Sequence, residues 1–302
     1  MITIVRFIFR LAAAMFVFSA MLVLSVGPAL ADETVLWPYF SFPPMVVLDE
    51  AGKPSGINIT IQDMLFEALP QFEHQRIQSP FTRSMSNVKA GATYCFTGLL
   101  RTPEREQWLA YSLPCRLSAP NVILARKGEM QGLVRDGAAS VAELLEQPGL
   151  RLGLVSGFRY GQGLDEIIAS AQPDSVYHIH SLESAGHQID LLLAGRIDWL
   201  ITFPTQALYQ ARASGALDRL DFIPIAEPQE YIVGYVACTD NELGRQVIQG
   251  VDQVLADRVP TPAYREIFAG WVDQKQRATF MERYELLLAK PARAWQLQTD
   301  GN

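Results

Sequence analysis

Strand-like and helix-like segments alternate along this 302-residue chain in two successive series. In the first series, ETVLW, QRIQSPF and TYCFTGL have the short apolar pattern of strands, whereas INITIQDMLFEALPQF and SMSNVKAG have the pattern of helices. A strand–helix–strand order of this kind predicts a largely parallel sheet with helices on both faces. The sequence therefore predicts an α/β fold.

The second series begins after residue 140 with the strand-like segments LRLGLVSG, VYHIHSL and RIDWLITF, which alternate with helix-like segments. Extended segments near 121–127 and 221–229 lie where one series can pass into the other. We therefore expect two lobes, residues 32–123 with 228–302 and residues 124–227, joined by two hinge strands. Because α/β proteins bind ligands at the carboxyl ends of their strands, the predicted binding site is a cleft between the lobes.

The N-terminus has the pattern of a secretory signal peptide. Arg6 and Arg10 precede and border an apolar run at 11–26, and Ala29-Leu30-Ala31 supplies small residues before a cut. The alternative is a retained membrane anchor, because the run is near the lower length limit for a membrane span. The polar residues after Ala31 favour cleavage there, so we expect a periplasmic protein with a signal peptide at residues 1–31.

Cleavage after Ala31 would change the formal net charge from −7 to −9, because Arg6 and Arg10 are the charged residues removed. A chain this acidic is a poor candidate for binding nucleic acid or an anionic membrane, which require basic patches. The sequence also lacks a phosphate-binding loop, an H-E-x-x-H helix and a G-x-S-x-G turn. We therefore expect no cofactor, no metal and no nucleic-acid partner.

Three cysteines, Cys95, Cys115 and Cys238, follow the predicted cleavage site. In an oxidising compartment, one pair is expected to form a disulfide and to leave one thiol over. The pair that we favour is Cys95–Cys115, which would close a loop of about 20 residues. The alternative is three unpaired and partly buried thiols.

The stretch CFTGLLRTPERE, residues 95–106, places a cation where a helix is predicted to begin. Thr102 and Pro103 suit the N-cap and first helical positions, so Arg105 would lie in the first turn, beside unpaired backbone amides. That position favours an anion and disfavours a cation. A bound anion would relieve this unfavourable placement. The alternative is that Arg105 pairs with Glu104 or Glu106 on a solvated surface.

Several of these segments together resemble bacterial extracellular solute-binding proteins, family 3, the family of amino-acid uptake systems. The resemblance rests on the order of FPPM, GKPSGINITIQDML, KAGATYCFTGLLRTPEREQWLAYSLP, LRLGLVSGFRYGQGL, LLLAGRIDWLI and YIVGYVACTDNELGRQVIQGVDQVLAD. It implies a two-lobed periplasmic-binding-protein type II fold that closes on a small ligand. It also implies a monomer that delivers this ligand to an inner-membrane ABC permease.

The resemblance implies a role for Arg105, because the family arginine at this position binds the α-carboxylate of the ligand. A guanidinium suits this role, since it offers two parallel donors to a carboxylate. VSG at 155–157 is expected to end a strand and open a helix, which would give a second anion-binding end. Asp198 is expected to be structural. The candidate ligand-binding residues are Arg105, Gly98, Leu100, Tyr39, Phe42, Trp37, Gly157, Phe158, Phe203 and Arg83, the last as a second anion contact.

Departures from the family pattern point to the type of ligand. Leu100 and Phe203 stand where the family places a hydroxyl and an aspartate around the α-ammonium of an amino acid. Phe158 replaces a threonine or serine, and Tyr39 stands where an acid is common. Because a buried ammonium without anionic partners is costly, we predict a carboxylate with an aromatic or apolar body.

Two other functions remain open from the sequence. A protein of this type can serve as a sensing subunit for a membrane receptor, and cyclohexadienyl dehydratases resemble these binding proteins. A dehydratase would need a carboxyl group as general acid or base, for which Glu104, Glu106 and Glu230 are the candidates. Binding without catalysis is the predicted function.

Overall fold

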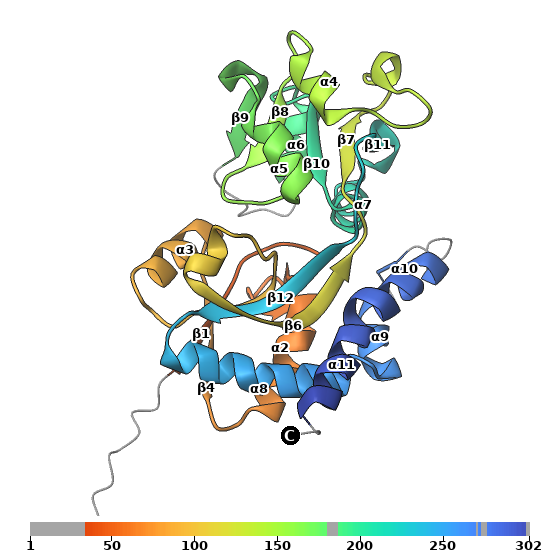
Figure 1. Cartoon of the computed structure of the whole chain (residues 1–302). Helices are drawn as coiled ribbons and strands as arrows, with labels where there is room; N and C mark the ends of the chain where they lie inside the picture. The colour runs from red at the N-terminus through yellow and green to blue at the C-terminus, as the bar shows by residue number, and fades with distance from the viewer. Residues whose placement is uncertain (1–33, 180–186, 270, 273–276, 300–302) are drawn as a thin grey trace, which may run out of the picture. The chain divides into compact units, whose positions relative to one another are not determined.

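The structure is a computed structural model that describes residues 34–179, 187–269, 271–272 and 277–299 (Figure 1). The predicted signal peptide at 1–31 lies outside the described residues. Within the described ranges, no helix combines the length and the apolar character that a membrane span requires.

One group of strands contains an antiparallel sheet with the order β5-β12-β6 and a parallel pair, β1 with β4. A parallel bridge between Leu36 and Tyr94 joins β1 to the residue before β5. The strands are β1 (Thr34–Tyr39), β4 (Glu73–Gln78), β5 (Cys95–Leu99), β6 (Leu109–Ser118) and β12 (Ile232–Thr239), with a small hairpin of β2 (Val47–Leu48) and β3 (Pro54–Ser55). The helices are α2 (Ile57–Ala68), α3 (Phe81–Lys89), α8 (Glu242–Arg258), α9 (Pro262–Ala269), α10 (Arg277–Tyr284) and α11 (Lys290–Thr299), with a π-helical turn, η6 (Glu285–Ala289).

The second group of strands forms a five-stranded sheet with the order β11-β7-β10-β8-β9. Strands β10, β8 and β9 are parallel, whereas β7 runs antiparallel to both β10 and β11. The strands are β7 (Val122–Arg126), β8 (Leu152–Val155), β9 (Val176–Ile179), β10 (Trp199–Thr202) and β11 (Leu220–Pro224). The helices are α4 (Val141–Glu146), α5 (Gln162–Ala169), α6 (His187–Leu193) and α7 (Pro204–Ala213), with short 3₁₀ turns η3 (Gln131–Leu133), η4 (Pro173–Ser175) and η5 (Leu217–Arg219).

The chain passes between the two groups twice, from β6 to β7 through residues 119–121 and from β11 to β12 through residues 225–231. The strand–helix alternation seen in the sequence accounts for the parallel pairs. The strands on either side of the two connections account for the antiparallel pairs, so the sheets are mixed. We propose lobe boundaries close to these two connections.

Trp37 was a candidate ligand contact, but the structure places it in the core. Its side chain is 0% exposed, its Nε1 donates to His74 Nδ1 at 3.1 Å, and its ring centroid lies 5.2 Å from that of Phe66. The reason is its position within β1, where helix α2 covers the side chain of Trp37. The prediction that Trp37 contacts the ligand is therefore wrong.

The predicted Cys95–Cys115 disulfide is also wrong. The structure pairs Cys95 with Cys238, two cysteines 143 residues apart in the sequence, and leaves Cys115 as a buried thiol. Cys95 on β5 and Cys238 on β12 are direct cross-strand partners, with their Cα atoms 4.1 Å apart. Burial raises the pKa of the Cys115 thiol to about 12. Strand pairing, which loop length does not reveal, therefore determines the disulfide.

Strand β6 was not predicted, because Pro114 interrupts its apolar pattern. A proline lacks the N–H that a sheet interior requires and is tolerated at bulges. Here the register between β12 and β6 shifts between Gly234 and Tyr235, and Tyr235 is the partner of Pro114. The irregular pairing accommodates the proline, so a ten-residue strand forms across it.

A buried carboxyl beside β6 leads to a prediction about stability. Asp252 on α8 accepts a hydrogen bond from the Leu113 backbone N–H at 2.6 Å, and burial raises its pKa from 3.8 to about 6. The folded state therefore binds more protons than the unfolded state between roughly pH 4 and 6, and the free energy of unfolding falls as pH rises through this window. Asp252→Asn keeps an acceptor oxygen and removes the charge.

We expect Asp252→Asn to raise the free energy of unfolding at pH 7.5 by about 1 to 2 kcal/mol, and to have little effect near pH 4. Urea unfolding of both proteins at the two pH values measures this difference. A variant that is less stable than wild type at pH 7.5 would contradict the assignment.

Candidate ligand-binding site

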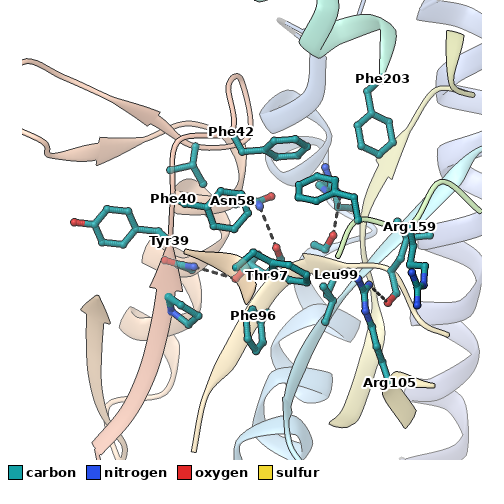
Figure 2. A pocket seen from close by; sticks show the side chains of 18 residues that line it. Tyr39, Phe40, Phe42, Asn58, Phe96, Thr97, Leu99, Arg105, Arg159 and Phe203 are labelled. Atoms are coloured by element: carbon teal, nitrogen blue, oxygen red, sulfur yellow. Dashed lines mark hydrogen bonds between the residues drawn. The ribbon is translucent and has the colours of Figure 1, made fainter. Parts of the chain in front are cut away.

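A cavity of about 100 Å³ lies where residues from both groups of strands meet. It is bordered by the end of β1 and the loop after it, α2, the first residue of α3, β5 with the loop after it, η2 (Arg105–Gln107) and β6. The loop after β8 and the residue before α7 complete it. The lining residues are Pro38, Tyr39, Phe40, Phe42, Val46, Asn58, Gln62, Phe81, Phe96, Thr97, Gly98, Leu99, Leu100, Arg105, Arg116, Phe158, Arg159 and Phe203 (Figure 2).

Arg105 is a buried side chain of this cavity, only 6% exposed. Its Nη1 donates to the Leu100 carbonyl at 3.0 Å, and its Nη2 donates to the Gly157 carbonyl at 3.2 Å. The guanidinium carbon also lies 5.4 Å from the centre of the Phe81 ring. Burial lowers the pKa of Arg105. Two carbonyls thus orient a guanidinium that has three further N–H donors.

The helical segment at Arg105 is shorter than predicted. A single 3₁₀ turn, η2, forms in place of a helix. Its N-cap residue is Glu104 and not Thr102, although Thr102 Oγ1 still accepts a hydrogen bond from the Arg105 backbone N–H at 3.3 Å. The alternative that Arg105 pairs with its glutamate neighbours is wrong, since Glu104 forms an ion pair with Arg159 and Glu106 forms one with Arg101. Among the described residues, no carboxylate lies within ion-pair distance of Arg105.

The sequence predicted that the VSG segment opens a helix, but in the structure it does not. Helix α5 begins at Gln162, after a loop that follows β8. The Tyr160 backbone N–H donates to Asp165 at 2.9 Å, and the Tyr160 hydroxyl accepts from the Val155 backbone N–H at 3.3 Å, so both ends of the loop are held. Gly157 contributes its carbonyl oxygen to Arg105 and does not line the cavity itself.

Phenylalanine rings form much of the remaining lining. The Phe42 ring lies 5.4 Å from that of Phe158 and 6.3 Å from that of Phe203, and the Phe81 ring lies 5.9 Å from that of Phe158. Tyr39, Phe42, Leu100, Phe158 and Phe203 line the cavity, as the sequence suggested. The hydroxyl of Tyr39 points away from Arg105 and Arg159 (Figure 2). Phe40, Phe81 and Phe96 also line the cavity and were not predicted, because they belong to no motif in the sequence.

Arg83, the second anion contact that the sequence suggested, lies outside this cavity. It is exposed on α3, whereas Phe81 at the start of the same helix lines the cavity. Residues two positions apart in a helix are separated by about 200° around its axis, so both side chains cannot face the cavity. Asp198 is structural, as expected, because it accepts hydrogen bonds from Arg126 Nη2 at 2.8 Å and from the Arg151 backbone N–H at 2.9 Å.

Arg116 is a cavity residue that sequence reasoning missed. It is 4% exposed, and its Nη2 donates to the Gly98 carbonyl at 2.8 Å. Its guanidinium carbon lies 5.9 Å from the centre of the Phe203 ring. Burial lowers its pKa to about 10, so it remains protonated at neutral pH. Nothing in the sequence indicated that Arg116 lines the cavity, because Arg116 lies on β6, the strand that was not predicted.

Among the described residues of the cavity lining, the charged side chains are all cationic. Arg105, Arg116 and Arg159 line it, and no aspartate or glutamate is found among the described residues that do so. Glu104 balances Arg159 through an ion pair. The other two guanidinium groups give the cavity a net positive charge beside an aromatic lining. An anion with an apolar body suits this combination.

Gly98 leads to a second prediction. Its φ is +75°, and a Cβ added there would lie 2.5 Å from Arg116 Nε and 3.1 Å from Asn58 Oδ1. Gly98→Ala should therefore lower the free energy of unfolding by about 1 to 3 kcal/mol, through backbone strain and displacement of Arg116. Thermal unfolding measures this effect. Gly91→Ala, at φ +90° with no atom within 4 Å of the added Cβ, separates the backbone strain from the clash.

Comparison with known proteins identifies the family. The profile of bacterial extracellular solute-binding proteins, family 3, matches residues 39–274 of the chain. A comparison with curated proteins yields no match.

Solved structures with the same fold include a putative L-cystine ABC transporter from Listeria monocytogenes, with 16% identity and a TM-score of 0.64 over 80% of this chain and 97% of that chain. A histidine kinase sensor domain with similarity to periplasmic binding proteins has 19% identity and a TM-score of 0.62, over 79% of this chain and 95% of that chain. The ancestral amino-acid-binding protein AncCDT-1, a precursor of cyclohexadienyl dehydratase, has 16% identity and a TM-score of 0.61, over 80% and 96%.

These likenesses confirm the α/β fold of the two-lobed periplasmic binding proteins. The family profile spans most of the chain, from the end of β1 to beyond α9. This chain therefore belongs to the bacterial extracellular solute-binding proteins, family 3.

Proposed function

We propose that this protein is exported to the periplasm, captures a small carboxylate-bearing ligand in the cavity and delivers it to an ABC-type permease. The observation that supports this most strongly is Arg105, which is buried, oriented by two carbonyls and without an ion-pair partner among the described residues. A guanidinium in this state gains from a carboxylate that accepts its remaining donors. The likeness to a putative L-cystine ABC transporter supports the permease as partner.

The ligand that we propose lacks an α-ammonium group. Leu100 and Phe203 line the cavity, and no carboxylate is found among the described residues of the lining. An ammonium buried there would have no anionic partner, which is costly. The phenylalanine rings would instead cover an aromatic or apolar body.

Three compounds that share a phenylethyl skeleton test this proposal. 3-Phenylpropionate carries a carboxylate, phenethylamine carries an ammonium, and phenylalanine carries both. A ligand at 100 times its dissociation constant stabilises a protein by about 2.7 kcal/mol, which for this chain length raises Tm by roughly 5 to 10 °C. We expect the largest rise with 3-phenylpropionate and none with phenethylamine. A larger rise with phenylalanine than with 3-phenylpropionate would overturn the proposed ligand class.

We propose binding without catalysis. Glu104 and Glu106 form ion pairs with Arg159 and Arg101, and Glu230 is exposed. None of the three lines the cavity, so none is placed to act as a general acid or base on a bound acid. Incubation with prephenate or arogenate, followed by a search for an aromatic product, tests the dehydratase alternative suggested by the likeness to AncCDT-1.

The second candidate is a sensing role, which the likeness to a histidine kinase sensor domain supports. Both roles use the same cavity, so binding assays do not separate them. The two roles are separated by measuring the uptake of a labelled acid in cells with and without the gene. Transport predicts that uptake falls when the gene is deleted, whereas sensing predicts unchanged uptake.

A further inference from the structure

Arg116 lies in a slot that two glycines leave open. On the sheet β5-β12-β6, Arg116 of β6 is paired with Gly234 of β12, and its side chain crosses β12 to reach the carbonyl of Gly98 on β5. A Cβ added at Gly234 would lie 2.9 Å from Gly98 O and 3.0 Å from Arg116 Nε. A Cβ added at Gly98 would lie 2.5 Å from the same Nε. Neither glycine could carry a side chain without displacing this guanidinium.

The guanidinium in the slot is poorly satisfied. Arg116 Nε and Nη1 are buried and have no hydrogen-bond partner among the described residues. No carboxylate of the described chain lies within ion-pair distance of Arg116, and the single hydrogen bond goes to a neutral carbonyl. A buried and unpaired charge is expensive, and proteins rarely keep one without a partner. Burial of this cation therefore lowers the free energy of unfolding, and an anionic ligand could offset this loss.

This cation and the neighbouring Asn58 both line the ligand cavity. Arg116 lines the same cavity as Arg105. Asn58 of α2 also lines it, and its Nδ2 donates to the Thr97 carbonyl at 3.0 Å while its Oδ1 is buried without a partner among the described residues (Figure 2). Within the described ranges, two unpartnered donors of Arg116 and one unpartnered acceptor of Asn58 thus lie beside Gly98, and the donors, like those of Arg105, are the groups that an anion can satisfy.

We propose that Arg116 is a second anion-binding residue of this cavity and that the ligand carries two anionic groups, one bound by Arg105 and one by Arg116. This inference rests on the proposed function, which supplies the first carboxylate at Arg105. It narrows the ligand class to small dicarboxylates whose apolar part is covered by the phenylalanine rings. Arg159 is not the second anion site, because Glu104 already neutralises it.

Two acids with one skeleton test the second anion site by calorimetry. 3-Phenylpropionate has one carboxylate, and phenylsuccinate adds a second to the same chain. A charge-assisted hydrogen bond contributes enough to expect that wild type binds phenylsuccinate about tenfold or more tighter than 3-phenylpropionate. Arg116→Met should abolish this preference, because it should weaken the binding of phenylsuccinate by about tenfold or more beyond any effect on 3-phenylpropionate. Arg159→Met, which removes a lining cation that is already paired, should keep most of the preference.

The stability of the unliganded protein gives an independent readout. Because Arg116→Met replaces an unpaired buried cation with an apolar chain, it should raise Tm by roughly 2 to 4 °C. An arginine kept for structure would instead lower Tm when replaced. If Arg116→Met does not fold, the test is made instead by NMR on wild-type protein labelled with ¹⁵N-arginine. The Arg116 Nε–H signal, assigned with Arg116→Lys, should then shift with phenylsuccinate and not with 3-phenylpropionate.

The outcomes separate this inference from the proposed function. If wild type binds 3-phenylpropionate but shows no preference for phenylsuccinate, the second anion site is overturned and the proposed function stands. If Arg116→Met weakens both acids equally, or lowers Tm and keeps the preference, the second site is also overturned. If wild type binds neither acid, the proposed function is overturned and the inference with it.

Discussion

Replacing Arg105 with alanine is expected to weaken the binding of 3-phenylpropionate by about 30-fold or more. The variant loses a buried and charge-assisted pair with the carboxylate, and truncation of one partner in such a pair costs about 2 to 5 kcal/mol. Arg105→Lys keeps the charge but not the two parallel donors, so its affinity should fall by roughly tenfold. Isothermal titration calorimetry of the three proteins at pH 7.5 measures both effects.

Arg83→Ala is the matched control for this experiment. Arg83 is an exposed arginine on α3 that does not line the cavity, so its removal changes the net charge equally and should leave the affinity within about twofold. If Arg105→Ala folds and binds the acid as tightly as wild type, the carboxylate does not bind at Arg105. An equal loss of affinity in Arg83→Ala would point to long-range electrostatics.

Removal of the Cys95–Cys238 disulfide should have the largest effect on stability. The two residues are 143 positions apart, and a loop of this length contributes about 4 to 5 kcal/mol when it is closed by a disulfide. The Cys95→Ala, Cys238→Ala double variant should therefore unfold at a much lower urea concentration than oxidised wild type. Reduced wild type should resemble the double variant.

Cys115→Ala serves as the control for the disulfide. Because Cys115 is buried and unpaired, its replacement should cost only about 1 kcal/mol and should keep the effect of reductant. Oxidised wild type should show one thiol after unfolding, and Cys115→Ala should show none. Peptide mapping that finds Cys95 linked to Cys115 would contradict this pairing.

Local patterns in the sequence were sufficient for most of the elements, and together with the family resemblance they pointed to the most important cation. The apolar spacing of INITIQDMLFEA matches helix α2, and CFTGL matches β5. The position of Arg105 after β5, beside Thr102 and Pro103, identified an anion-binding candidate, and the structure buries that side chain in a cavity. These features depend on neighbours along the chain, which is why a single sequence reveals them.

Features that depend on distant strands were not predictable in this way. The Cys95–Cys238 pair requires the register of β5 against β12. The slot that holds Arg116 requires Gly98 and Gly234 on those same two strands. It also requires strand β6, which was not predicted because of Pro114. The sequence therefore identified one of the three arginines in the described cavity lining and missed Arg116 and Arg159.

Position along a strand explains a further error. Trp37 and Tyr39 both belong to β1, and both were expected at the ligand. Only Tyr39, at the carboxyl end of the strand, lines the cavity, whereas Trp37 is covered by α2. An aromatic cluster in the sequence does not indicate which of its rings faces a ligand.

The most direct test of this account is a crystal structure of the protein with the tightest-binding acid of the screen. We expect the carboxylate to lie in the cavity and to accept two hydrogen bonds from the Arg105 guanidinium, with donor–acceptor distances of about 2.7 to 2.9 Å. An acid bound elsewhere on the protein, or one bound in the cavity with its carboxylate directed away from Arg105, would contradict it.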